Sequence, residues 1–462
     1  MVELRHLRSG GRLILPPVIR RFVALSCAFL SIVCSIGCRS NQVSLPMAHQ
    51  AFAKGDLETA TGVLNELADG SQTLRYPSEL DLAVVELASG KAPEAETRLR
   101  QLREHFDAVA AVSVKDAASM VTDDRTRDFA LADYEDVMLR TLLAVCSLSS
   151  GSGDATAYLL QAQSRQEELA ERLAKADDGP RYNLQVALAP YLHGAIREAS
   201  HQDYDDAERA FRLVSQIQPG FLPAAEDIAR ASTGTHSPKG HGVVYVVSLV
   251  GEGPQRVEEV AATTTASLQI ASSILKTVRN EADDRDEPVL PNIASVKVPT
   301  VVVPESPIAA VGVRTALGFL GATQTVTDVG TLAREQCDAE MPWTIARAVA
   351  RRVLKETSVA AVSDSIGLSG NAASVLEFAA SSVWSGAEKA DTRCWSLLPR
   401  EFQVLRAALP AGPQTLEFVP LGHGGQPIAA PINHSLTMEN GRNHYVFVFA
   451  PGQIVSIVDS AP

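Results

Sequence analysis

The stretch "STGTHSPKGHGVVYVVSLVGEGP", residues 232–254, marks a change in the secondary structure that the chain predicts. Its first part, residues 232–241, is rich in Gly, Ser, Thr and Pro, a composition typical of a linker. The second part, residues 242–254, is dense in β-branched side chains and ends in Gly-Glu-Gly-Pro, which predicts a buried strand closed by a turn. We therefore expect one architecture before this stretch and another after it.

Residues 38–231, before the linker, show a helical pattern. Ala and Leu recur at helical spacing and are interrupted at short intervals by Gly. The ranges 48–67 and 79–102 each predict two helices joined by a turn, the first turn at Gly55 and the second at Gly90. A small residue follows each of these glycines by five positions, which would let the paired helices approach closely.

Residues 194–230 form the clearest predicted helix pair. Asp203 stands where it would cap the second helix, and Pro219-Gly220 ends it. The unit resembles a tetratricopeptide repeat, a helix hairpin of about 34 residues that stacks on its neighbours because one hairpin cannot bury its own apolar face. Such arrays most often bind peptides or organise partners, so the resemblance implies protein partners on the concave face. An array without a ligand is the alternative.

Residues 242–462, after the linker, predict a mixture of strands and helices. Further signals indicate strands at 294–304 and 309–326 and helices at 328–338, 342–357 and 371–386. From Glu401 the chain predicts antiparallel hairpins closed by Pro-Ala-Gly-Pro and Pro-Gly turns. The predicted fold class is therefore α+β: a TPR-like helical repeat domain, then a mixed domain with an antiparallel, β-rich C-terminal end.

Three arginines, Arg347, Arg351 and Arg352, share the helix predicted over 342–357. They could hold an anionic ligand. On an amphipathic surface helix, a solvated basic face is the interpretation that we favour.

Residues 1–37 have the pattern of an export signal. Five arginines lie in the first 21 residues, and residues 22–37 carry no charge, as in the positive and apolar regions of a signal peptide. This uncharged run is shorter than the roughly 20 apolar residues that a membrane-spanning helix needs. We therefore expect cleavage rather than an uncleaved anchor.

Cys38 would become the first residue after cleavage, and "SIGC" (35–38) resembles the lipobox of bacterial lipoproteins. Gly37 fits the small residue before the modified cysteine, whereas Ser35 stands where that motif usually has leucine. The resemblance implies a lipid-anchored protein, and two or more acyl chains suffice for stable membrane attachment. Arg39 is not the aspartate that retains many such proteins at the inner membrane, which implies the outer membrane, facing the periplasm. Unlipidated secretion is the alternative.

Four stretches together resemble a family of bacterial envelope lipoproteins that has a TPR-like front half and a mixed second half. They are residues 129–148, residues 242–259, the Ala/Arg helix ending at Lys355, and residues 388–412. The last is the most specific, through Ala390, Asp391, Thr392, Arg393, Trp395, Leu398 and Pro399. The family implies an architecture and an envelope location but brings no established reaction.

Asp391, Arg393 and Trp395 are the candidate ligand-binding residues. Asp391 and Arg393 stand two apart between a predicted helix and a strand, where an ion pair or backbone capping would fix the crossover. Trp395 could plug the interface. Because ion-pair networks occur as often in structural roles as in sites, we favour the structural interpretation. The same residue types also line ligand pockets, so this remains the alternative.

Motifs for catalysis and cofactors are missing from the sequence. No HExxH, Walker A or GxSxG pattern occurs. His423, His434 and His444 lack neighbouring ligands at zinc spacing, and after Cys38 three irregularly spaced cysteines remain, Cys146, Cys337 and Cys394. We predict no catalytic residue, no metal and no cofactor. For the three cysteines we predict buried thiols, and one disulfide between two of them is the alternative.

The charge pattern argues against nucleic-acid partners. The formal net charge is −13, and no Lys/Arg cluster follows residue 38, whereas phosphate binding needs basic patches. The sequence as a whole predicts a non-catalytic, exported, lipid-anchored scaffold that binds proteins through its helical repeat. The alternative is an envelope enzyme acting on glycan or peptidoglycan with a site near Asp391 and Arg393.

Overall fold

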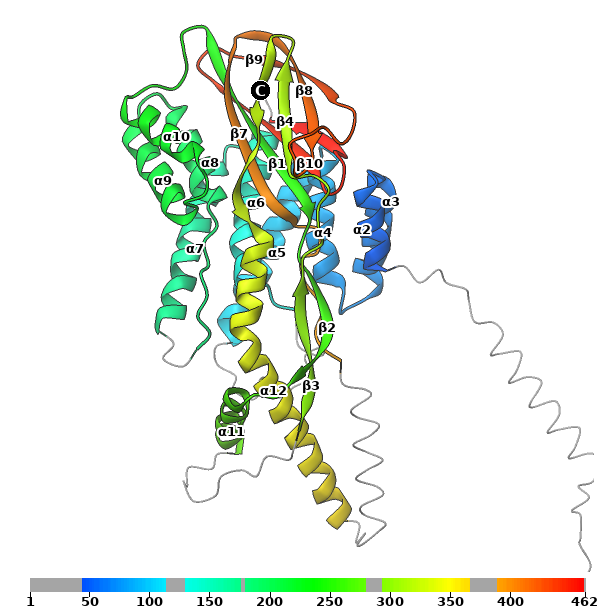
Figure 1. Ribbon diagram of the computed structural model, residues 1–462. Helices are drawn as coiled ribbons and strands as arrows, with labels where there is room; N and C mark the ends of the chain where they lie inside the picture. Colours follow the sequence, from blue (N-terminus) through cyan, green and yellow to red (C-terminus); the bar gives the residue numbers. More distant parts are fainter. Residues whose placement is uncertain (1–43, 114–128, 176–178, 280–292, 366–388, 461–462) are drawn as a thin grey trace, which may run out of the picture. The chain divides into compact units, whose positions relative to one another are not determined.

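The computed structural model describes residues 44–113, 129–175, 179–279, 293–365 and 389–460 (Figure 1). In these ranges the fold is α+β, with helices concentrated in the first half and strands in the second, which confirms the predicted class. Residues 1–43, which hold the predicted export signal and Cys38, lie outside the described residues, as does the helix predicted at 371–386.

Nine helices make up the described residues of the first half. Each packs on the next along the chain. They are α2 (Leu45–Ala53), α3 (Leu57–Gly70), α4 (Arg75–Ala88), α5 (Ala92–Ser113), α6 (Asp133–Ser150), α7 (Ala155–Lys175), α8 (Leu188–Glu198), α9 (Tyr204–Ile217) and α10 (Pro223–Ser232). The helix pairs predicted at 48–67, 79–102 and 194–230 are therefore confirmed.

Local sequence explains how these hairpins form. Gly55 and Gly90 adopt φ of +79° and +73° at the turns, a region that favours glycine. Ala60 and Ala95, the small residues that follow, are fully buried between helices. Asp203 occupies the N-cap position of α9, but its side chain makes no capping hydrogen bond and instead pairs with Arg197 at 3.3 Å. The predicted cap is thus wrong in its bonding, although its position is right.

Strand β1 (His241–Glu252) is the centre of a five-stranded sheet. The strand order is β11-β10-β1-β7-β6, with β6 (Gln324–Asp328), β7 (Pro399–Pro410), β10 (Asn443–Ala450) and β11 (Ser456–Asp459). Residues 242–251 of β1 are all buried, as expected of a strand covered on both faces. β10 and β11 form the antiparallel hairpin expected at the Pro-Gly turn. The hairpin expected at Pro-Ala-Gly-Pro is wrong, because β7 and β8 (Gly412–Leu421), on either side of that turn, belong to different sheets, and β10 pairs parallel with β1.

A second sheet packs on the first, and a two-stranded ribbon stands apart from both. The second sheet has the order β5-β4-β8-β9, with β4 (Ala310–Thr315), β5 (Gly318–Ala322), β8 (Gly412–Leu421) and β9 (Ile432–Met438). Val246 and Val448 of the first sheet share a buried apolar core with Val311 and Phe418 of the second. The β half therefore contains a sandwich of two sheets.

The ribbon pairs β2 (Gln255–Ala262) with β3 (Ser295–Val302). It shares a core with α11 (Thr265–Arg279) and α12 (Val329–Ser365), in which Leu275, Val298 and Val349 are buried together. The sequence predicts two helices over 328–338 and 342–357, but α12 runs through Pro342 without ending. Met341 and Ile345, on either side of Pro342, pack in the same core, so the packing of α12 continues across the proline.

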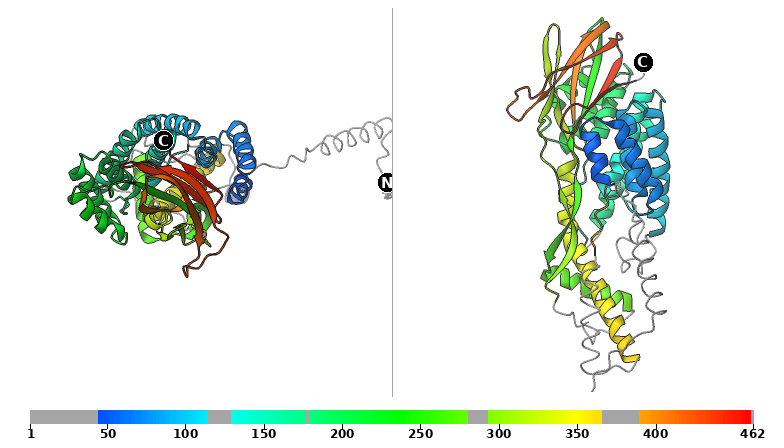
Figure 2. Two further views of the ribbon diagram at one scale, coloured as in Figure 1. Left: turned by 90° about the horizontal axis from the view of Figure 1, so that it is seen from above. Right: turned by 90° about the vertical axis from the view of Figure 1, so that its right-hand side faces the viewer.

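The two halves pack against each other through polar contacts (Figure 2). Glu198 of α8 is fully buried and accepts hydrogen bonds from Arg230 of α10 at 2.6 Å and from the hydroxyl of Tyr245 in β1 at 3.1 Å. Arg406 of β7 lies 3.5 Å from the same carboxylate. Residues from Ser44 onward form one compact unit. The change of secondary structure falls at 232–241 as expected, whereas the division into separate domains stays a prediction.

Candidate functional site

Asp391, Arg393 and Trp395 lie in one segment, residues 389–398, that leads into β7 without regular secondary structure. The N–H of Ala390 donates to the carboxylate of Glu258 in β2 at 2.8 Å. Further along, backbone N–H groups of the segment donate to carboxylates of α4 and α6. The segment therefore runs between the ribbon and the helical half and is held from both sides.

Asp391 and Arg393 form a two-pronged ion pair. Nε of Arg393 donates to Oδ1 of Asp391 at 2.8 Å, and Nη2 donates to Oδ2 at 2.7 Å. Arg393 is 8% exposed, and its guanidinium lies over the ring of Phe129, 5.8 Å from the centroid. The ion pair that the structural interpretation predicts is therefore present.

Trp395 is fully buried beside α6. Its backbone N–H donates to Oε1 of Glu135 at 2.9 Å, while its indole N–H has no hydrogen-bond partner in the described part of the chain. Burial raises the pKa of Glu135, although nearby Arg256 and the hydrogen bonds that it accepts oppose this. Trp395 lies at the interface between the halves. It lines neither of the two cavities that are described next.

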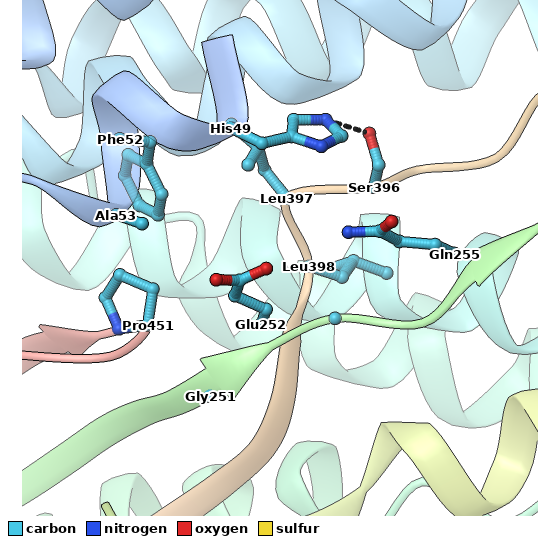
Figure 3. A pocket seen from close by; sticks show the side chains of 11 residues that line it. His49, Phe52, Ala53, Gly251, Glu252, Gln255, Ser396, Leu397, Leu398 and Pro451 are labelled. Carbon is cyan, nitrogen blue, oxygen red and sulfur yellow. Dashed lines mark hydrogen bonds between the residues drawn. The ribbon is translucent and has the colours of Figure 1, made fainter. Parts of the chain in front are cut away.

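The smaller cavity is lined by a Ser and a His that sequence reasoning missed (Figure 3), and the Ser is bound to an Asp that does not line the cavity. Ser396 donates its hydroxyl proton to Oδ2 of Asp81 at 2.7 Å and lies 2.8 Å from Nε2 of His49. Asp81 also accepts from the N–H of Leu397 at 2.8 Å. Figure 3 shows His49 directed at Ser396, with Glu252 below it.

These three residues differ from a catalytic triad in geometry. In a triad the aspartate holds the histidine nitrogen that points away from the serine. Here Asp81 binds Ser396 itself and lies 3.5 Å from the same Nε2 of His49 that faces the serine. The cavity measures about 20 Å³, room for about one water molecule. The group works as a clamp on the segment, and the signal for it was an aspartate inside the apolar pattern of α4.

The larger cavity, which we call the Asp391 cavity, has a volume of about 300 Å³. The ribbon, α12, residues 130–134 and Asp391 enclose it. Its polar lining side chains include Arg256, Gln336, Cys337, Glu340, Arg347 and Asp391. Asp391 therefore reaches a polar cavity, while Arg393 and Trp395 do not line it.

Each carboxylate that lines the Asp391 cavity already has a partner. Asp391 is held by Arg393, and Asp133 pairs with Arg172 at 2.6 Å. Glu340 accepts from the side-chain amide of Gln336 at 2.9 Å. Each of these acidic groups is therefore engaged by a side chain of the protein itself.

Arg256 is the cation of this cavity with the weakest contacts. Burial acts to lower its pKa, but the nearby acidic groups, Glu135 foremost, together outweigh burial and raise the pKa, so the guanidinium is charged. In the described ranges it donates one long hydrogen bond, to the carbonyl oxygen of Arg393 at 3.4 Å, and forms no ion pair.

Of the three arginines predicted to form a basic face on α12, Arg351 is buried, and Arg347 and Arg352 are half-buried. Arg347 lines the Asp391 cavity, and Arg351 is 6% exposed. The expectation of a solvated basic face is therefore wrong at Arg351, because α12 packs between α11 and the ribbon instead of lying on the surface.

The three described cysteines are free. Burial raises the pKa of Cys146 and raises that of Cys394 to about 12, so both are inert buried thiols. Burial also raises the pKa of Cys337, which lines the Asp391 cavity and contacts the carbonyl oxygen of Pro299. A thiol with a raised pKa is a poor nucleophile.

His434 and His444 meet at Asp459, at 2.8 and 3.5 Å, whereas His423 contacts the carbonyl oxygen of Ser306. Within the described ranges no group of three or more His, Cys, Asp or Glu side chains could hold a metal ion. Among the same residues, no helix combines the length and the apolar character that crossing a membrane requires.

Comparisons with known proteins add little. No model of a known family matches the chain, and no curated protein matches it. One solved structure, titled "Crystal structure of MamA protein", matches with a TM-score of 0.26 and 16% identity over 41% of this chain and 79% of that one. At this TM-score the likeness does not establish a shared fold. The resemblance to envelope lipoproteins stays a prediction.

Proposed function

We propose that the protein is a non-catalytic scaffold of the cell envelope that is exported, anchored by lipid at Cys38 and bound to partner proteins through its helical half. The observation that carries the binding role is the unbroken series of helices α2–α10, each packed on its neighbour. Stacked helix pairs of this kind offer extended surfaces to partners.

The structure changes where on the helices a partner would bind. The sequence predicts a partner on the concave face, but Asp81, Glu135 and Glu198 use that side of their helices to bind the chain's own segment 389–398 and β1. The partner surface that we propose is therefore the outward side of the helices. The exposed apolar side chains of the helical half include Leu160 of α7 and Leu213 of α9, 45% and 36% exposed, and Leu222, at the N-cap of α10, 75% exposed.

A test of partner binding compares the full chain with a double variant, Leu160→Glu and Leu213→Glu. Proteins crosslinked to the wild type in intact cell envelopes are identified by mass spectrometry. The proposal predicts that a specific partner is lost from the variant while its thermal unfolding temperature is unchanged, because both side chains are exposed. An unchanged set of crosslinked proteins would contradict the outward surface as the binding site. The matched control is Val302→Glu, an exposed position on the ribbon.

Export and lipid anchoring rest on the sequence pattern alone and have their own test. The mature N-terminus is purified from membranes of a native-like bacterial host and its mass is measured. The proposal predicts a chain that begins at an acylated Cys38. An unmodified N-terminus, or one that begins at Met1, would contradict the anchor.

An envelope enzyme acting on glycan or peptidoglycan is the second candidate function, and the Asp391 cavity is the observation that favours it. Its carboxylates are engaged by partners and its thiol has a raised pKa, so binding fits the geometry better than catalysis. Turnover of peptidoglycan fragments that disappears in Asp391→Asn, with the fold intact, would favour the enzyme over the scaffold.

A further inference from the structure

The Asp391 cavity holds two polar groups whose hydrogen-bonding capacity the described residues do not fully use. One is the guanidinium of Arg256, and the other is the side-chain carbonyl of Gln336. Both line the same cavity of about 300 Å³, a volume at the lower end for small-molecule sites. A buried polar atom without a partner, such as Oε1 of Gln336, is uncommon and calls for an explanation, and Arg256 in the same cavity makes only one long hydrogen bond.

Arg256 offers an incompletely used cationic fork. A guanidinium has five N–H donors in a plane that matches the two oxygens of a carboxylate. Its one hydrogen bond, to the Arg393 carbonyl oxygen, is long at 3.4 Å. Glu135 provides a compensating charge nearby, but its oxygens accept from the N–H groups of Ala132 and Trp395 instead. Arg256 thus keeps donors for an anion in the cavity.

Gln336 offers an unused acceptor. The residue is 5% exposed, and its amide nitrogen donates to Glu340 at 2.9 Å, which fixes the orientation of the amide. Its carbonyl oxygen, Oε1, is then left without a donor. Since leaving a buried acceptor unsatisfied is unfavourable, a ligand that brings a donor would gain affinity there.

We infer that the Asp391 cavity binds a small molecule that carries both a carboxylate and a hydrogen-bond donor, such as an ammonium or hydroxyl group. Its carboxylate pairs with Arg256, and its donor reaches Oε1 of Gln336 beside the carboxylate of Glu340. Free amino acids, short peptides and sugar acids share this chemistry. The site is additional to the proposed scaffold role and does not depend on it.

Cys337 provides a built-in reporter of the cavity. It lines the cavity and is partly exposed, whereas the other two described cysteines are buried. A bound ligand should slow alkylation of Cys337, followed by peptide mass spectrometry, and leave the other two thiols unchanged. This readout places binding in the cavity itself, which a thermal shift alone does not.

The experiment measures thermal shift and Cys337 alkylation of the full-length chain in detergent with defined probes. The probes are the L- and D-forms of alanine and glutamate, the dipeptide Ala-Glu, and glucuronate, each beside its neutral amide. The inference predicts that at least one acid raises the unfolding temperature and protects Cys337, and that its amide does neither. Protection by the amino acids or the peptide, but not by glucuronate, would identify the ligand class as amino acids or peptides. Protection by glucuronate alone would identify it as sugar acids. No effect from any acid, or equal effects of acid and amide, would overturn the inference.

Two variants separate binding from folding. Arg256→Gln removes the charged fork and should weaken the active probe about tenfold or more. Gln336→Met keeps the side-chain length and removes the unused acceptor together with the donor to Glu340, so it should bind the probe more weakly, and its unfolding temperature without the probe shows whether it is folded. Arg212→Gln, an exposed arginine on α9, is the matched control and should bind normally. If Gln336→Met folds and binds like the wild type, the proposed contact between the ligand's donor and Oε1 of Gln336 is wrong.

Discussion

Gly253 lies between the end of β1 and the start of β2. The packing around it leaves no room for a side chain. A Cβ placed there would lie 1.8 Å from the carbonyl oxygen of Leu398, which is backbone and cannot move aside. We predict that Gly253→Ala lowers the free energy of unfolding by about 3 kcal/mol, as measured by urea denaturation.

Gly220→Ala is the control for that substitution. Its added Cβ would meet nothing within 4 Å, so the same chemical change should leave the free energy of unfolding nearly unaltered. Equal losses in the two variants would show that the segment does not approach β1 as closely as the structure indicates.

Asp81 is a second residue whose role is to hold the segment. Asp81→Ala leaves the N–H of Leu397 and the hydroxyl of Ser396 without their acceptor, and should cost about 1–3 kcal/mol of unfolding free energy. Asp205→Ala, an exposed aspartate of α9 in a surface ion pair, should cost less than about 1 kcal/mol in the same urea titration. The reverse order of the two losses would contradict the clamp.

The spacing of residues in the sequence predicts only contacts between near neighbours in this site. Asp391 and Arg393 stand two residues apart, so their ion pair follows from short-range geometry. Asp81 and Leu397 are separated by more than 300 positions, and Glu135 and Trp395 by 260. No local pattern pairs residues so distant, which is why the clamp and the cavity around Asp391 were not predictable from one sequence.

At the scale of elements, β11 depends on a charged contact with the other sheet. This four-residue edge strand pairs only with β10, but its Asp459 accepts a hydrogen bond from His434 of β9 at 2.8 Å. Burial acts to raise the pKa of Asp459, yet the hydrogen bond from His434 and the nearby charges of His434 and His444 together outweigh it and lower the pKa from 3.8 to about 2. The contact therefore joins the two sheets of the sandwich.

The lowered pKa makes a prediction with a definite sign. A carboxyl whose pKa is lower in the folded state stabilises the protein above its unfolded pKa, and that contribution is lost as pH falls from about 4 to about 2. Urea unfolding between pH 5 and pH 2.5 should show a steeper loss of stability for the wild type than for Asp459→Asn. Parallel pH profiles for the two proteins would rule the contact out as a stabilising one.

Periodicity predicts elements well where one face alone is buried, and less well elsewhere. The helix pairs of the first half follow from Ala and Leu spacing, because each helix packs on its sequence neighbours. The parallel pairing of β1 with β10 joins strands about 190 residues apart, and no turn signal marks it. The course of α12 through Pro342 likewise depends on packing against α11 and β3, which the sequence does not reveal.

At the scale of the whole molecule, Glu198 ties both halves into one cooperative unit. Glu198→Gln leaves Arg230 and Arg406 facing a neutral group in a buried position, and breaking a buried ion pair typically costs about 3–5 kcal/mol. We predict that this variant unfolds at lower urea concentration, with the helical signal in far-ultraviolet circular dichroism and the signal of the sheet core moving together. Separate transitions for the two halves would contradict a single unit.

The central claim is that the chain fills the inner side of its own helices with segment 389–398, so that partners bind elsewhere. Hydrogen exchange of backbone amides followed by mass spectrometry tests it most directly. The structure predicts that peptides containing Trp395 and Leu397, whose N–H groups donate to Glu135 and Asp81, exchange as slowly as the cores of α4 and α6. Exchange of those amides at the rate of an exposed loop would mean that the segment leaves the helices, and that their inner side is open to a partner.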